Sequence, residues 1–236
     1  MHLAIIPDGN RRFAKKYNIS LEEAYRRGIG KIKDVIEWLK DSNINELTLW
    51  GFSTDNFMRD EKEKSIIWKL LKEKLDELIE EYKKSEDERK KELKINFFGE
   101  LEKIPEEIKE KCYELQHLTH NNNGKYTLNI LLAYGGKNEI VNAVNKAIKE
   151  KISQINVIGY ENFYIRNEDI EKYLTVKREV DLIIRTGGEK RLSGYLLWQS
   201  IYSELAFSDK LWPEFTEDDL REILKDFSLR ERRFGR

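Results

Sequence analysis

An acidic residue stands among four basic ones near the start of the chain, in the stretch AIIPDGNRRFAKK of residues 4–16. Arginine side chains grip phosphate oxygens in a two-pronged fashion, and glycine lets the backbone approach a ligand closely. A carboxylate repels phosphates unless a cation lies between them, and Mg²⁺ is commonly held by one or two carboxylates together with substrate phosphate oxygens. We therefore take Asp8 as a candidate Mg²⁺ ligand. Read alone, PDG is also an ordinary turn, and that interpretation stays open.

Three further stretches carry the same kinds of residue directly after apolar runs. Glycines, helix amino ends and arginines together predict a site for more than one phosphate group. Each stretch alone has a plainer explanation, because GGK suits a helix-entry turn and Arg185 could pair with a structural carboxylate. The residues are Ser53, Asp55, Asn56 and Arg59; Gly135, Gly136 and Lys137; and Arg185, Thr186, Gly187, Gly188, Glu189, Arg191 and Ser193.

Apolar periodicity indicates the elements that must position these residues. Strands alternating with helices predict an α/β fold with a mostly parallel sheet, in which ligands bind at the carboxyl ends of the strands. Without a repeat, linker or composition break, residues 1–236 are expected to form a single domain. The predicted strands are 2–7, 45–53, 94–100, 125–134 and 180–188. The first predicted helix begins after the strand 2–7, with Asn10 as its cap. The other predicted helices cover 29–39, 61–94, 105–118, 135–151 and a stretch that Thr216 caps.

The composition limits the classes of partner. Forty-three basic against 44 acidic residues offer no general attraction to nucleic acid, so no such partner is expected. The single cysteine, Cys112, excludes an internal disulfide and fits a reducing compartment. No apolar run has the length of a membrane span, so we expect a cytoplasmic protein, with a place at the membrane surface left open. Leu131 and Lys33 stand where the two common nucleotide motifs need glycine.

Four motifs, taken in order, resemble those of the cis-prenyltransferases, the undecaprenyl and dehydrodolichyl diphosphate synthase family. The resemblance spans almost the whole chain. It implies a homodimer that elongates an allylic diphosphate, farnesyl or geranylgeranyl diphosphate, with isopentenyl diphosphate and Mg²⁺. The product would be a cis-polyprenyl diphosphate that partitions to the membrane and serves as a glycosyl-carrier lipid precursor. The motifs are HLAIIPDGNRRFAKK, GFSTDNFMRD, LNILLAYGGKNEI and DLIIRTGGEKRLSGYLLWQSIYSELAFSDKLWPEF, with RERRFGR at the end.

The resemblance also implies roles for individual residues. Asp8 corresponds to the catalytic, Mg²⁺-binding aspartate, and Glu204 to an acidic residue that helps to organise metal and diphosphate. Ser53 and Asn56 correspond to catalytic residues that orient the reacting ends. The implied substrate-binding residues are Gly9, Asn10, Arg11, Arg12 and Phe13 for the allylic diphosphate, Phe57 and Arg59 beside the reacting ends, Arg185, Arg191 and Ser193 for isopentenyl diphosphate, and Arg233 and Gly235 reaching the partner subunit's site. The residues do not decide which group removes the proton.

Two departures from the family pattern concern the allylic site. Tyr25 stands where many members have histidine, and Leu21 stands near the place of an arginine found in bacterial members. We therefore expect allylic binding to depend more strongly on Arg11 and Arg12.

The family's apolar tunnel would run between the sheet and the helix at roughly 61–85. Gly51 and Tyr126 are its expected wall positions. The charge-rich stretch 83–93 is either a sign of longer products or a solvated extension of the helix.

Two other functions stay open. A Mg²⁺-dependent phosphotransferase acting on a nucleotide would use the same anion site, but the chain carries no nucleotide motif. A non-catalytic partner subunit of a prenyltransferase heteromer should have lost the metal aspartate or the arginine pair. Asp8, Arg185 and Arg191 are all present, so we predict an active enzyme.

Overall fold

The computed structural model describes residues 1–40, 42–84, 92–120, 124–154 and 163–231. Six strands form one sheet in the order β3-β4-β2-β1-β5-β6, and every neighbouring pair is parallel. All carboxyl ends therefore lie at one edge, as predicted. The strands are β1 His2–Ile6, β2 Glu46–Trp50, β3 Leu93–Phe98, β4 Tyr126–Leu131, β5 Leu182–Arg185 and β6 Glu204–Phe207. The periodicity did not predict β6, because only Ala206 of this edge strand is buried and its residues show no long apolar run.

Helices connect the strands, and their ends follow local capping rules. The Thr216 hydroxyl accepts the backbone N–H of Asp219, which confirms the predicted cap. The prediction that Asn10 caps the first helix was wrong, because Gly9 is the N-cap residue, with φ of 119°. No described helix is long and apolar enough to cross a membrane. The helices are α1 Asn10–Tyr17, α2 Leu21–Leu39, α3 Glu61–Lys84, α4 Glu106–His120, α5 Gly136–Ser153, α7 Asn167–Glu171 and α8 Glu217–Leu229, with 3₁₀ turns η1 Thr54–Met58, η3 Leu101–Lys103 and η5 Trp212–Glu214.

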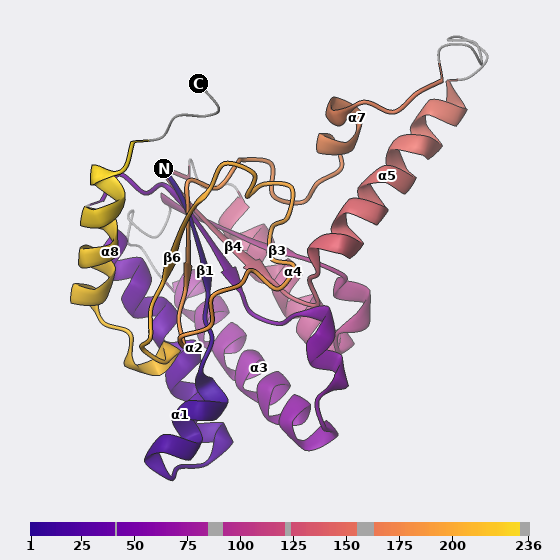
Figure 1. Ribbon diagram of the computed structural model, residues 1–236. Helices are drawn as coiled ribbons and strands as arrows, with labels where there is room; N and C mark the ends of the chain where they lie inside the picture. Colours follow the sequence, from indigo (N-terminus) through magenta and orange to yellow (C-terminus); the bar gives the residue numbers. More distant parts are fainter. Residues whose placement is uncertain (41, 85–91, 121–123, 155–162, 232–236) are drawn as a thin grey trace.

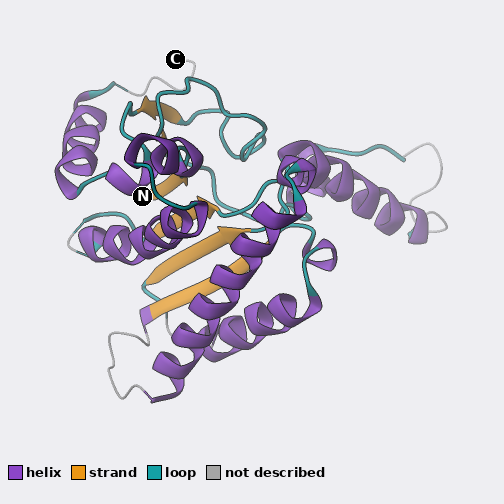
Figure 2. Ribbon diagram, turned by 90° about the horizontal axis from the view of Figure 1, so that it is seen from below, coloured by secondary structure: helices purple, strands orange, loops and turns teal. Residues whose placement is uncertain are grey.

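The two faces of the sheet are covered differently. Leu3 and Ile5 of β1 belong to a large core with α2, α3, α4 and α8, and the long helices lie along the strands on this face (Figure 2). Ala4 and Ile6 point to the other face and pack on the segment 176–196, which is largely irregular. Helices α5 and α7 extend away from the sheet (Figure 1). The space that matters for function lies on the helical face.

A buried histidine ties β1 to β2 on the second face. His2 is fully buried, with Nε2 at 2.8 Å from the Thr48 hydroxyl and Nδ1 at 3.1 Å from the Glu179 carbonyl oxygen. Burial lowers the pKa of His2 below its usual value near 6.5, although the carboxylate of Glu46 opposes this. The neutral ring is therefore the form that stabilises the fold.

We expect the unfolding free energy to fall as the medium is acidified below about pH 6.5. A group whose pKa is lower in the folded state stabilises it above its unfolded pKa and loses that contribution as the pH falls. The loss from one group is at most about 1.4 kcal/mol per pH unit. Denaturant titrations between pH 8 and 5 should show this slope in the wild type. The exposed-histidine variant His117→Gln should retain it, and an equal slope in His2→Gln would contradict the assignment.

Candidate active site

The carboxylate of Asp8 follows β1 and is held at the carboxyl edge of the sheet. Its Oδ2 accepts a hydrogen bond from Arg185 at 2.8 Å, and its Oδ1 lies 3.1 Å from a guanidinium nitrogen of Arg12. Its backbone carbonyl oxygen accepts from the Thr186 hydroxyl at 2.8 Å and from the Trp212 backbone N–H at 2.9 Å. The side chain is 31% exposed. The turn predicted from PDG is therefore present, and it holds the Asp8 carboxylate in a fixed position that solvent still reaches.

Gly9 makes this turn possible. Its φ of 119° is a conformation that side chains other than glycine rarely adopt, and a Cβ here would lie 2.9 Å from the Cα of Leu211. Asn10 follows as the first residue of α1, and its Oδ1 is buried without a hydrogen-bond partner in the described part of the chain. The start of α1 is therefore tightly packed beside Asp8.

Arg185, the last residue of β5, brings a buried cation to the same place. Its side chain is only 7% exposed, and it donates to the Ser193 hydroxyl at 2.9 Å and to the Arg191 carbonyl oxygen at 2.6 Å. Its Nε is buried and has no partner among the residues that the structure describes. Arg185 therefore pairs with a carboxylate, that of Asp8, and brings a positive charge to the lining of the cavity.

The two arginines of α1 are not equally available to a ligand. Arg12 donates to the carbonyl oxygen of Gly187 and lies against Asp8, so its guanidinium already joins two strand ends. Arg11 is 66% exposed, and its nearest acidic partner is Glu63 at 3.7 Å. An incoming anion therefore finds Arg11 freer than Arg12.

Ser53 and Asn56 form a capping box on η1, directly after β2. The Ser53 hydroxyl accepts the Asn56 backbone N–H at 3.2 Å, and the Asn56 side-chain oxygen accepts the Ser53 backbone N–H at 3.1 Å. Both residues line the same cavity as Asp8. Arg59 ends η1 and donates to the Tyr25 hydroxyl at 2.8 Å. The second strand end is thus ordered before any ligand arrives.

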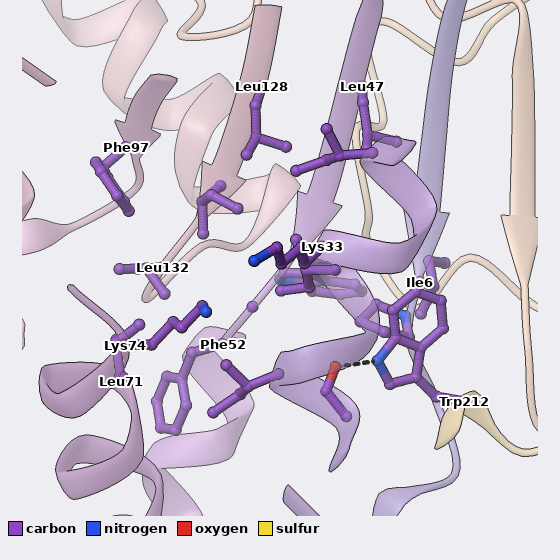
Figure 3. Close-up of a pocket in the computed structure, with 18 of the residues that line it drawn as sticks. Ile6, Lys33, Leu47, Phe52, Leu71, Lys74, Phe97, Leu128, Leu132 and Trp212 are labelled. Carbon is purple, nitrogen blue, oxygen red and sulfur yellow. Dashed lines mark hydrogen bonds between the residues drawn. The ribbon is translucent and has the colours of Figure 1, made fainter. Parts of the chain in front are cut away.

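One cavity of about 1450 Å³ opens at these polar residues and continues along the helical face of the sheet. Common small-molecule pockets measure about 300–1,000 Å³, so this cavity suits a longer ligand. Its inner wall is mostly apolar, and Figure 3 shows side chains from the strands and from α3 facing it, among them Leu47, Leu71, Phe97, Leu128 and Leu132. The structure places both predicted wall positions, Gly51 and Tyr126, on its lining.

The mouth of the cavity fits a magnesium ion that shares its coordination with a substrate. No group of three or more His, Cys, Asp or Glu side chains that could hold a metal occurs in the described ranges. Mg²⁺ does not need such a group, because one carboxylate with phosphate oxygens and water satisfies it. Asp8 is a partly exposed carboxylate beside an anion site. Its oxygens would hold the ion, which would neutralise negative charge on a bound diphosphate.

Two predicted site residues take supporting positions instead. Phe13 is 5% exposed, packs with Ala14 and Ala24, and does not line the cavity. Phe57 packs edge-on against Phe52 at a ring distance of 5.1 Å, and only Phe52 of this pair lines the cavity. The rings of Phe13 and Phe57 therefore pack against other side chains, and this structure does not support direct substrate contact by either residue.

The loop after β5 contributes Ser193 to the cavity, while the side chain of Arg191 turns outward. Arg191 is 60% exposed, pairs with Glu189 at 2.5 Å and does not line the cavity. It reaches the site through its carbonyl oxygen, which accepts from Arg185. An isopentenyl diphosphate contact by the Arg191 side chain stays a prediction.

The strand end after β4 does not join the site, contrary to our expectation for all four strand ends. The Gly136 backbone N–H donates to the Gly194 carbonyl oxygen at 2.8 Å, and a Cβ at Gly136 would lie 2.5 Å from that oxygen. Neither Gly135, Gly136 nor Lys137 lines the cavity. The plainer explanation, a helix-entry turn, is the correct one here.

Glu204 lies at the opposite end of the sheet from Asp8. The register pairs Leu3 with Leu182 and Leu182 with Glu204, so Glu204 is level with the start of β1. Strands rise about 3.3 Å per residue, which puts several residues of strand between the two carboxylates. Glu204 instead pairs with Arg230 at 2.8 Å. One chain therefore cannot share a metal ion between Asp8 and Glu204. The predicted residues Arg233 and Gly235 lie outside the described residues.

Sequence reasoning missed one buried acidic residue beside the site. Glu63 is 3% exposed and lies within reach of Tyr25, Arg59 and Arg11. A signal was available, because Glu63 precedes Ile67 by four residues and therefore falls on the apolar stripe of α3. A carboxylate on such a stripe is buried and must have partners.

Fold and site together define a class of protein. A parallel α/β sheet carries a carboxylate and several arginine side chains at its carboxyl edge, and these line the mouth of a long, mostly apolar cavity. Such an arrangement suits a phosphorylated compound with an extended hydrocarbon part.

Comparison with known proteins agrees with this class. The family model for undecaprenyl diphosphate synthase matches residues 6–235. A tritrans,polycis-undecaprenyl-diphosphate synthase (geranylgeranyl-diphosphate specific) from Pyrococcus furiosus is 38% identical over 237 residues, covering 100% of this chain and 86% of that protein. An isoprenyl transferase from Thermus thermophilus is 37% identical over 237 residues, covering 100% and 88%. The crystal structure of lavandulyl diphosphate synthase from Lavandula x intermedia in complex with dimethylallyl diphosphate superposes with a TM-score of 0.88 at 30% identity, covering 100% and 98%.

The chain belongs to the undecaprenyl diphosphate synthase family, the cis-prenyltransferases, and is a polyprenyl diphosphate synthase. The resemblance seen in its motifs is confirmed, and neither a nucleotide phosphotransferase nor a silent subunit is retained.

Proposed function

We propose that this enzyme elongates geranylgeranyl or farnesyl diphosphate with isopentenyl diphosphate to a long cis-polyprenyl diphosphate, with Mg²⁺. The observation that carries the proposal is one continuous cavity that joins the Asp8 and Arg185 site to a mostly apolar wall along the helical face of the sheet. A headgroup and a growing hydrocarbon need this combination. The relatives' names support the substrate class, because the Pyrococcus furiosus protein is geranylgeranyl-diphosphate specific.

Different residues at the mouth of the cavity would bind the two diphosphate substrates. Arg11 and the start of α1 would hold the allylic diphosphate, whose bond to carbon breaks. Arg185 and Ser193 would hold isopentenyl diphosphate, whose double bond attacks. Cationic donors placed where diphosphate charge develops lower the barrier for that bond cleavage. The capping box of Ser53 and Asn56 lies on the same cavity and would keep the two reacting ends aligned.

We propose that Asp8 holds the Mg²⁺ required by the reaction. When bound, the ion supplies charge neutralisation for the diphosphate. The donor set supports this role, because Asp8 combines a rigid position with partial exposure.

Product length should follow the free volume of the cavity. A Cβ at Gly51 would lie 3.0 Å from the Leu132 side chain, so a larger residue there must enter the lumen. We expect Gly51→Leu to shorten the main product by one or more isoprene units, read by chromatography of the dephosphorylated products. Gly30→Leu is the matched control, because a Cβ at Gly30 meets nothing within 4 Å. An unchanged product distribution in Gly51→Leu would contradict the assignment of this wall.

We further propose a homodimer that pairs through the β6 edge. This strand is the last of the sheet; Leu205 within it is 37% exposed, and Ile201 and Tyr202 just before it are 69% and 51% exposed. Exposed apolar side chains on an edge strand favour pairing with another chain. Light scattering should give about twice 28.2 kDa, and a mass of 28.2 kDa would refute the dimer. The contribution of Arg233 and Gly235 to the partner's site remains part of this proposal.

One assay tests the function as a whole. The purified protein is incubated with labelled isopentenyl diphosphate, Mg²⁺ and, in parallel, dimethylallyl, geranyl, farnesyl or geranylgeranyl diphosphate, and the products are extracted into organic solvent. Label in the organic phase with a farnesyl or geranylgeranyl primer supports the proposal. Label with dimethylallyl diphosphate alone would indicate a short-chain enzyme, and no label with any primer would refute the elongation. We expect the product to enter the membrane from a cytoplasmic enzyme, as a carrier-lipid precursor does.

A further inference from the structure

A buried carboxylate, Glu63, connects three segments that surround the mouth of the cavity. Its Oε1 accepts the Tyr25 hydroxyl of α2 at 2.6 Å and lies 3.2 Å from a guanidinium nitrogen of Arg59, which precedes α3. Its Oε2 faces the Nε of Arg11 in α1 at 3.7 Å. The Arg59 guanidinium also donates to the Tyr25 hydroxyl at 2.8 Å, so these groups form a closed network.

Glu63 itself does not reach the ligand space. Its side chain is 3% exposed, and the residue does not line the cavity, whereas Arg11, Tyr25 and Arg59 do. Its own position is set by the first turn of α3, where the Asp60 side chain accepts its backbone N–H at 2.8 Å. A carboxylate placed in this way contacts the ligand-facing groups from behind.

The charges explain why such a carboxylate is useful. A buried carboxylate beside a diphosphate site would repel the ligand if it were alone, but two guanidinium groups pair with it. The corner formed by Arg11, Arg59 and Glu63 keeps a net charge of one positive unit. Arg11 is long and 66% exposed, so without an acceptor it would sample many rotamers. A fixed carboxylate that pairs with both arginines restricts them before the anion binds, and preorganised donors bind more tightly than mobile ones.

We propose that Glu63 is a positioning residue for the allylic diphosphate, which it affects by orienting Arg11 and Arg59 from behind. Tyr25 completes the arrangement by bridging the carboxylate and Arg59. The inference rests on the proposed function for the identity of the anion. The orientation of the two arginines by Glu63 rests on the structure alone.

Steady-state kinetics with each substrate varied in turn tests the proposal. Glu63→Ala removes the acceptor and should raise the allylic KM about tenfold, while the isopentenyl KM stays within about twofold. Glu63→Gln keeps a side-chain oxygen and should raise the allylic KM about threefold. Glu61→Gln is the matched control, because Glu61 lies two residues away on α3 and is 91% exposed. An unchanged or lowered allylic KM in Glu63→Ala would overturn the proposal, and so would an equal rise in both KM values.

A double-mutant cycle separates positioning from a general loss of structure. Arg11→Ala should raise the allylic KM. Adding Glu63→Ala to this variant should raise the allylic KM by a smaller factor than Glu63→Ala does in the wild type, because Arg11, one of the two arginines that Glu63 orients, is already absent. Full additivity would contradict the coupling. If the wild type shows no turnover, the proposed function fails, and binding of inorganic diphosphate then tests Glu63 separately. Weaker binding by Glu63→Ala than by Glu61→Gln supports the positioning role, and equal binding overturns it.

Discussion

Replacing Asp8 by asparagine should lower turnover by about 10³-fold or more while the protein remains folded. Asparagine keeps an oxygen that can accept from Arg185 at 2.8 Å, so the local geometry is largely retained. It loses the negative charge, and with it the ability to hold Mg²⁺ strongly. The measurement is label incorporation at saturating substrates, with circular dichroism of the same preparation.

The control for Asp8 is an aspartate with an ordinary surface ion pair. Asp34 is 51% exposed and lies 3.3 Å from Lys31, so Asp34→Asn should change turnover less than twofold. Asp8→Ala should be as inactive as Asp8→Asn. A large loss of thermal stability in Asp8→Asn, with turnover near the wild-type value, would show that the carboxylate serves the turn and not the chemistry.

Replacing Arg185 should produce the second largest loss of activity, and we expect this loss to appear in kcat/KM for isopentenyl diphosphate. The guanidinium is 7% exposed and makes bonds to Asp8, Ser193 and the Arg191 carbonyl oxygen at the same time. A charge-assisted bond from Arg185 to a bound diphosphate would be worth about 1.5–3 kcal/mol, so the loss of two such bonds in Arg185→Ala should lower kcat/KM for isopentenyl diphosphate by about 10²- to 10³-fold or more.

Arg185→Lys tests whether charge alone is sufficient. Lysine keeps the positive charge but cannot form the planar fork, so we expect an intermediate loss of about tenfold or more. Arg221, which is 71% exposed on α8, provides the control Arg221→Lys with activity near the wild type. An allylic KM that rises as much as the isopentenyl KM in Arg185→Lys would argue against separate sites for the two substrates.

The predicted element pattern was largely correct, and the reason is local. Each strand from β1 to β5 contains apolar residues bounded by turn residues, and the longer helices repeat their apolar residues every three to four positions. Thr216 as a cap needs only a residue three positions away. The errors at Asn10 and β6 also have local causes, namely a glycine in a left-handed conformation and an edge strand of which only one residue is buried.

The candidate site was predicted in part, because the carboxyl ends of parallel strands meet at one edge. Asp8 and Arg185 are 177 positions apart in the chain, yet the pairing of β1 with β5 joins them at 2.8 Å. The same reasoning failed for Gly136, whose strand end turns toward Gly194 on the other face. The alternation of a strand says which residues share a face, but it does not say which side the following loop takes.

The amino-acid sequence by itself determined the α/β class, the motifs of the cis-prenyltransferases and the principal ionic groups of the site. Only the tertiary structure decided that Glu204 lies at the far end of the sheet, that Phe13 packs with Ala14 and Ala24, and that Glu63 lies beside Arg11 and Arg59. Periodicity and capping depend on neighbours a few residues apart, so the sequence displays them directly. Strand register, helix placement and the cavity between them depend on contacts between distant segments, which exist only once the chain has folded.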